Sequence, residues 1–152
     1  MDKFKTVDDI LDFAINAEEE AYNLYMEIAT KTDKPALSKV LEQFAKQELE
    51  HKKKLQSIKS DGSLESVDSE YVQTLDIGDY MLDVKPSADM DYEKVLVLSM
   101  KAEQAAFDLY TTLANKATDA NAKKVLLALA KEEAAHKRIF EDEYEEFYLP
   151  EN

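Results

Sequence analysis

The sequence predicts an all-α protein, a four-helix bundle made of two helical hairpins joined by a long crossover. Among its 152 residues only 2 are Gly and 3 are Pro, and helix-favouring Ala, Leu, Glu and Lys are plentiful. Apolar residues recur at steps of three and four in four long segments. The chain also repeats at an offset of 85 residues, the separation of Glu18 from Glu103 and of His51 from His136. This length is enough for one domain, predicted to span residues 1–152.

The first hairpin is predicted to occupy residues 6–60. Its first helix should begin near Thr6, because Asp9 three residues later gives a weak capping-box pattern, and should end near Lys31. After a short break, Pro35 suits the first turn of the second helix. That helix should continue to about Lys59 and stop at the Asp-Gly pair that follows, a typical C-terminal signal.

The crossover is predicted to span residues 61–88, where the apolar pattern weakens and Gly78 and Pro86 interrupt it. A short helix between Tyr71 and Met81 is expected to pack over one end of the bundle. A connection of this length fits a compact domain if it crosses the bundle, and one crossover between two hairpins is the ferritin-like connectivity.

The second hairpin is predicted over residues 89–148. Its first helix should start between Asp89 and Tyr92 and end near Lys116. Thr118 and Asp119 should cap the last helix, which runs to about Tyr148.

Composition excludes several classes of function. The formal net charge of −14 argues against nucleic acid and anionic membranes as partners. No apolar run is long enough to span a bilayer and the N-terminus lacks the pattern of a signal peptide, so a soluble, cytoplasmic protein is expected. Because the sequence has no Cys, it has no disulfides, thiol catalysis or Cys-ligated metal.

Each predicted hairpin carries one Glu in the apolar stripe of its first helix and a Glu-x-x-His motif in the stripe of its second. Steps of three and four place all of them in the apolar stripes of their helices, near mid-helix. Four carboxylates and two imidazoles should therefore point into the bundle interior. The six predicted metal ligands are Glu18, Glu48, His51, Glu103, Glu133 and His136.

Four carboxylates cannot be buried together without compensation, because desolvation and mutual repulsion are costly. They could hold protons, or two divalent cations could balance their four charges. Oxygen-rich ligation with one imidazole per metal and no thiolate suits iron or manganese, and zinc can also occupy such a site. Two iron ions are the predicted cofactor; the alternative is a buried polar network without metal.

Tyr25 and Tyr110 each lie two turns after the ligand Glu of their own helix. They are either core aromatics whose hydroxyls find a hydrogen-bond partner, or donors that orient a ligand carboxylate or supply an electron. Four methionines, Met26, Met81, Met90 and Met100, are predicted to fill the core.

At these motifs the chain resembles the rubrerythrin-like branch of the ferritin-like superfamily, over roughly residues 7–58 and 92–144. The resemblance implies a di-iron centre that reduces hydrogen peroxide or O2 in oxidative-stress defence, and a homodimer. By analogy with the family, if Glu48 and Glu133 bridge the two irons, Glu18 and Glu103 are terminal ligands.

The chain departs from the family pattern at two points. Full-length rubrerythrins carry a rubredoxin-like module with four Cys, so an external electron donor such as a rubredoxin-like protein is implied here. Rubrerythrins also have an extra Glu, used in peroxide reduction, where this chain has Ala106. The remaining six-ligand pattern is similar to that of bacterioferritins, but Leu49 stands where their haem-ligating Met would be.

A di-iron oxidoreductase acting on hydrogen peroxide or O2 is therefore the leading functional prediction. Two alternatives remain: a protein that oxidises Fe(II) and passes the iron on, and an interaction module in which a redox-silent metal only stabilises the bundle.

Overall fold

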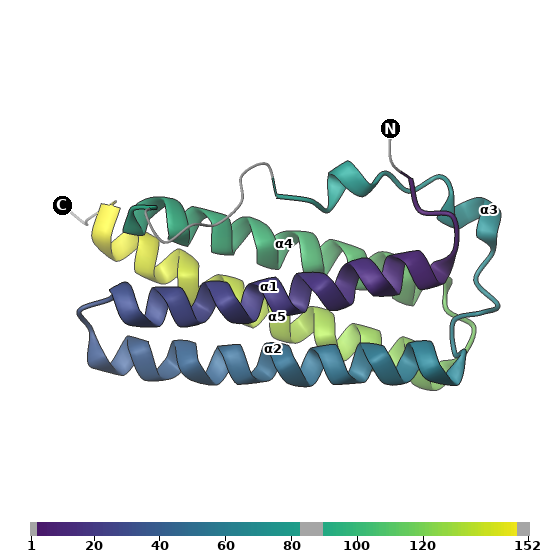
Figure 1. Ribbon diagram of the computed structural model, residues 1–152, viewed down its shortest axis with the longest axis horizontal. Helices are drawn as coiled ribbons and strands as arrows, with labels where there is room; N and C mark the ends of the chain where they lie inside the picture. The colour runs from purple at the N-terminus through teal and green to yellow at the C-terminus, as the bar shows by residue number, and fades with distance from the viewer. Residues whose placement is uncertain (1–2, 83–89, 149–152) are drawn as a thin grey trace.

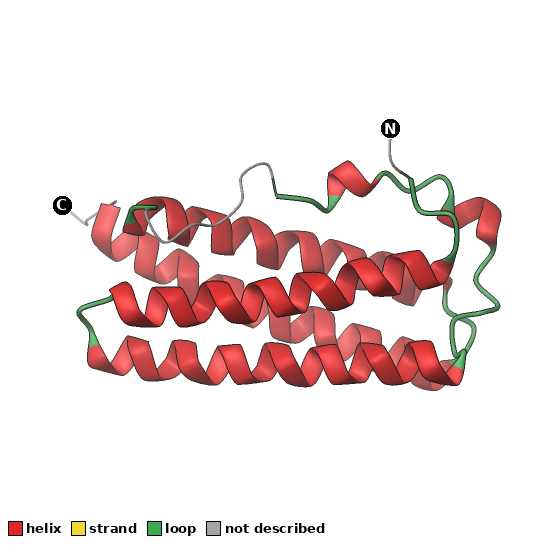
Figure 2. Ribbon diagram, in the orientation of Figure 1, coloured by secondary structure: helices red, strands yellow, loops and turns green. Residues whose placement is uncertain are grey.

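The computed structural model describes residues 3–82 and 90–148, and in this part of the chain it is helical without strands (Figures 1 and 2). The predicted all-α fold class is confirmed. The helices are α1 (Val7–Lys31), α2 (Pro35–Asp61), α3 (Ser69–Val72), the 3-10 turn η1 (Ile77–Asp79), α4 (Tyr92–Lys116) and α5 (Ala120–Tyr148).

The four long helices form two hairpins that pack side by side. α1 packs along α2 and α4 along α5, while α1 also contacts α4 and α2 contacts α5. The end of α2 and the start of α4 lie at opposite ends of the bundle (Figure 1), so the connection between them runs its length. This is the predicted ferritin-like connectivity. None of the described helices is long and apolar enough to cross a membrane.

Local sequence signals set the ends of the first hairpin as predicted. The Thr6 hydroxyl accepts a hydrogen bond from the Asp9 amide, and the Asp9 carboxylate accepts one from the Thr6 amide, completing a capping box. Pro35 opens α2, and Gly62 ends it with a φ of 67°, the left-handed conformation that glycine adopts without strain. In the second hairpin, Asp119 accepts from the Ala122 amide at the start of α5.

The crossover differs from its prediction. Instead of one helix between Tyr71 and Met81, the chain forms the four-residue α3 and the separate turn η1. The side chains of Asp68 and Asp76 explain this, because they accept from the Glu70 and Gly78 amides and so begin two short turns. Residues 83–89, which include Pro86, Asp89 and the predicted end of the crossover, lie outside the described residues.

The core consists of two apolar clusters. The first gathers Leu11, Leu55 and Leu126 with residues from the crossover, and the second gathers Ile28 and Phe140 with others near the opposite end. Along every long helix, the buried Glu or Glu-x-x-His lies between residues of one cluster and residues of the other. We call these six side chains the polar layer: Glu18, Glu48, His51, Glu103, Glu133 and His136.

Three of the four methionines pack against the core as predicted, since Met26, Met90 and Met100 are half-buried against the second cluster. The prediction is wrong for Met81, whose side chain is 57% exposed. It belongs to the crossover, which lies on the surface of the bundle rather than within it (Figure 1).

Candidate metal centre

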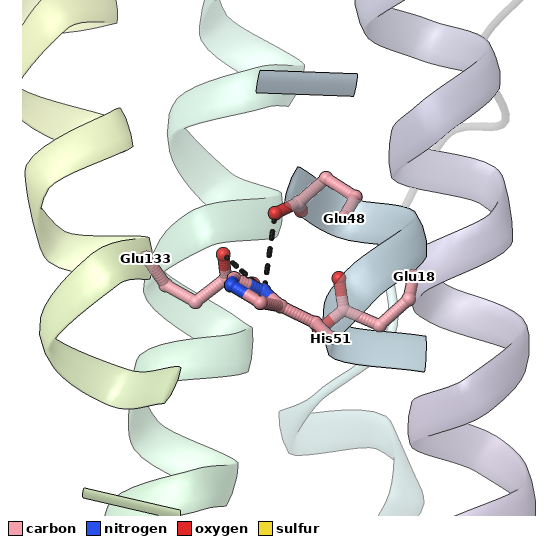
Figure 3. Close-up of side chains that lie close together, drawn as sticks. All are labelled: Glu18, Glu48, His51 and Glu133. Carbon is pink, nitrogen blue, oxygen red and sulfur yellow. Dashed lines mark ion pairs between the residues drawn. The ribbon is translucent and has the colours of Figure 1, made fainter. Parts of the chain in front are cut away.

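The structure brings all six predicted ligands together in the polar layer. Their exposed fractions are 2% or less, although carboxylates are rarely buried without partners. Figure 3 shows Glu18 from α1, Glu48 and His51 from α2, and Glu133 from α5 directed toward one another. The helical period explains this, because each side chain replaces an apolar residue in the stripe that faces the interior.

Potential ligand atoms form two overlapping groups, within each of which all atoms lie within 4.8 Å of one another. Both groups contain Glu48 and Glu133. One is completed by Glu18 and His51, the other by Glu103 and His136. Each group could hold a metal ion, and the two groups have two carboxylates in common.

Distances to the imidazoles distinguish the shared carboxylates. Glu48 Oε1 lies 3.3 Å from His51 Nδ1 and 3.4 Å from His136 Nδ1. Glu133 Oε1 lies 3.3 Å and 3.6 Å from the same two atoms. In contrast, Glu18 approaches only His51, at 3.6 Å, and Glu103 approaches only His136, at 3.0 Å.

Several buried polar atoms in this layer lack a hydrogen-bond partner within the described residues. They are one oxygen of Glu18, both oxygens of Glu48, one oxygen of Glu133 and Nδ1 of His51. Buried polar groups in folded proteins are nearly always paired, and the shortfall here falls on atoms that suit metal ligation. The residues present therefore fit a metal centre, and the cluster could bind metal.

Electrostatics supports the same conclusion. Burial and the neighbouring charge of Glu133 raise the pKa of Glu18 to about 7. Burial, followed by the charges of Glu133 and Glu48, raises the pKa of Glu103 well above its usual value. Burial alone would lower the pKa of His136, but contacts with Glu103 and Glu48 outweigh it and raise the pKa to about 10. Without cations the layer would hold protons that compete with metal.

The two tyrosines singled out in the sequence are both buried in the layer but differ in their contacts. The Tyr110 hydroxyl donates a hydrogen bond to Glu18 across the two hairpins. The Tyr25 hydroxyl has no hydrogen-bond partner in the described part of the chain, although burial and the nearby charges of Glu103 and Glu48 raise its pKa. Tyr110 is therefore placed to orient the Glu18 carboxylate.

The sequence reasoning did not single out two residues that contact the outer nitrogens of the imidazoles. His51 Nε2 lies 3.3 Å from Glu132 Oε1, and His136 Nε2 lies 2.6 Å from Gln47 Oε1. Both residues immediately precede a ligand Glu and are related by the 85-residue repeat. The register of the repeat is the signal that could have identified them.

A cavity of about 160 Å³ reaches the polar layer from the side of α1 and α4. Its walls are mainly small or apolar residues, among them Ala21 and Ala106, and its polar end includes all four layer carboxylates. Tyr80, Met81 and Leu82 of the crossover also line it. A small molecule can therefore approach the carboxylates without displacing a core side chain.

Comparison with family models gives a match over nearly the whole chain. The model described as Rubrerythrin matches residues 9–90 and 94–152. Comparisons with curated proteins and with solved structures gave no match.

Proposed function

Because the chain belongs to the rubrerythrin family, we propose that it is a di-iron oxidoreductase that reduces hydrogen peroxide or O2. The observation that carries this proposal is the pair of buried ligand groups that share Glu48 and Glu133. The sequence contains no Cys, so the electrons would come from a donor outside it, such as a rubredoxin-like protein.

In this proposal each half of the polar layer holds one iron ion. Glu18 and His51 would be the ligands specific to one ion, and Glu103 and His136 those specific to the other. Glu48 and Glu133 would bridge, which is supported by their closeness to both imidazoles. Two divalent ions would balance four carboxylates, and the oxygen-rich, thiolate-free ligand set suits iron or manganese.

When bound, the iron would supply electrons to the oxidant and be reduced again by the donor. The protein's own residues would fix the geometry and control access. Tyr110 holds the Glu18 carboxylate in place through its hydrogen bond. The apolar clusters on both sides of the polar layer shield it from bulk water except where the cavity reaches it.

The cavity supports a small, uncharged oxidant. Its volume of about 160 Å³ is close to that of an engineered cavity that binds benzene, so hydrogen peroxide and O2 fit easily. The walls are mostly apolar, and the charged residues that line them, Glu20 and the four layer glutamates, are all acidic, so a neutral molecule is favoured over an anion.

Iron loading followed by exposure to peroxide tests the proposal. The purified protein would be stripped with a chelator, loaded anaerobically with Fe(II), and analysed for iron per chain. We expect two iron ions per chain. Addition of hydrogen peroxide should rapidly convert Fe(II) to Fe(III), which Mössbauer or absorption spectroscopy would detect.

The matched variants are His51→Ala, which removes a proposed ligand, and Glu50→Gln, which changes an exposed carboxylate on the same helix. The first should lose iron and reactivity, whereas the second should retain both. Equal iron content and equal oxidation rates in His51→Ala and the unmodified protein would refute the assignment.

A further inference from the structure

The two imidazoles of the polar layer have different partners on their outer sides. His51, on α2, faces Glu132 on α5, while His136, on α5, faces Gln47 on α2. Each contact therefore crosses from one hairpin to the other. Positions 47 and 132 are equivalent in the 85-residue repeat, so the same place is filled by an amide in one half and by a carboxylate in the other.

Both contacts fix the same tautomer. When a cation is bound at Nδ1 each imidazole is neutral, and because the outer partner atom is an oxygen in each case, Nε2 carries the hydrogen and donates it. Nδ1 then presents its lone pair to the buried carboxylate cluster, where a cation would lie. The two rings are held alike, and the chemical difference between the halves lies in the charge of the outer acceptor.

A carboxylate acceptor makes an imidazole a stronger donor to a metal than an amide acceptor does, because its negative charge stabilises positive charge on the ring. The side chain of Glu132 is 42% exposed, so water weakens this effect but does not cancel the charge. The half with Glu18 and His51 thus has an additional negative group that the half with Glu103 and His136 lacks.

We propose that Glu132 and Gln47 are positioning residues that make the two halves of the centre unequal, so that the His51 half binds a divalent cation more tightly than the His136 half. The inference rests on the proposed two-metal centre. It adds that the first ion enters beside His51 and that the second, more weakly held ion lies beside His136.

Cobalt titration of the metal-stripped protein tests this without reference to activity. Co(II) binding would be followed by calorimetry and by visible absorption. Removing an outer partner of a metal-bound His costs about 10- to 100-fold in affinity, so we expect two separable steps that differ by about tenfold. Two variants show which binding step belongs to which half. Glu18→Gln should remove the tighter binding step, and Glu103→Gln should remove the weaker one.

Exchange of the outer partners provides the decisive comparison. Glu132→Gln should weaken the tighter step until the two steps nearly coincide, and Gln47→Glu should strengthen the weaker step. The double exchange should reverse the order, so that Glu18→Gln in that background removes the weaker step. Glu50→Gln, which removes an exposed carboxylate without an imidazole contact, should change neither step by more than about twofold.

The outcomes separate this inference from the proposed function. Two bound Co(II) ions with equal affinities, unchanged by Glu132→Gln, would overturn the inequality and leave the two-metal centre standing. Failure to bind Co(II) at all, in a protein whose circular dichroism shows an intact bundle, would overturn both.

Discussion

The Tyr110 hydroxyl on α4 donates a hydrogen bond to the Glu18 carboxylate on α1, and this bond connects the two hairpins inside the polar layer. Tyr25, its equivalent in the repeat, is equally buried but has no partner in the described residues. Two tyrosines that are interchangeable in the sequence pattern therefore have different roles in the structure.

Replacing Tyr110 with Phe should destabilise the metal-stripped protein by about 1–3 kcal/mol, because a buried Glu18 oxygen loses its donor. Tyr25→Phe removes a hydroxyl for which the described part of the chain offers no hydrogen-bond partner, so it should leave stability unchanged or slightly increased. Urea unfolding of the two variants measures the difference. A larger loss for Tyr25→Phe would contradict the assigned contacts.

The metal-stripped protein should lose stability as pH rises from about 4.5 to about 10. The pKa of Glu18 is raised to about 7 and that of Glu133 to about 8, in both cases first by burial. Contacts with Glu103 and Glu48, which outweigh burial, raise the pKa of His136 to about 10.

The folded state therefore holds protons that the unfolded chain has released, and folding becomes less favourable as pH increases. Each such proton lowers the free energy of unfolding by about 1.4 kcal/mol per pH unit within its window. Urea unfolding across this pH range measures the slope. Stability that rises with pH between 5 and 8 would contradict the assigned protonation.

Binding of a redox-inert cation should stabilise the bundle. Zn(II) can occupy the same ligands, and free Zn(II) at 100 times its dissociation constant would add about 2.7 kcal/mol per site. The expected result is a clear rise in melting temperature that EDTA reverses. Glu48→Gln should diminish the rise more than Glu18→Gln, because Glu48 belongs to both ligand groups whereas Glu18 belongs to one.

Ala106→Leu should slow the reaction of the iron-loaded protein with hydrogen peroxide. Ala106 is half-buried and lines the cavity, so the larger side chain would narrow the approach to the carboxylates. Iron content should stay unchanged, since Ala106 contributes no ligand atom. Stopped-flow measurements of the Fe(II) oxidation rate would compare this variant with Ala36→Leu, the same change at an exposed position of α2. The Ala36→Leu variant should react at the rate of the unmodified protein.

Gly62→Ala should cost about 1 kcal/mol in stability, because the left-handed conformation at this position is unfavourable for a residue with a Cβ. The added Cβ would also approach the Glu65 carboxylate to 2.8 Å, but that flexible side chain can move away. The same unfolding measurement on Ser63→Ala, one residue later, provides the control and should show a much smaller loss.

The helices and the burial of the six candidate ligands in one layer could be predicted because both depend on local pattern. A Glu placed in an apolar stripe, such as Glu103, points inward wherever the helix packs, and the paired motifs of the repeat identify the partners. The helix ends followed from the Thr6 capping box, Pro35 and Gly62 for the same reason.

Features that depend on how the helices are rotated against one another could not be predicted. The contacts of Glu132 and Gln47 with imidazoles of the opposite hairpin, and the difference between Tyr25 and Tyr110, arise only after the hairpins pack. The cavity likewise depends on the path of the crossover, where capping by Asp68 and Asp76 overrides the weak helical pattern.

The overlap of the two ligand groups has a consequence for how the protein matures. Neither hairpin on its own supplies a full set of ligand atoms, because each group takes at least one carboxylate from the other hairpin. A nascent chain that has formed only α1 and α2 cannot yet capture a cation in this manner. If the proposed centre forms, the binding of metal by a full ligand group would follow docking of the C-terminal half onto α1 and α2.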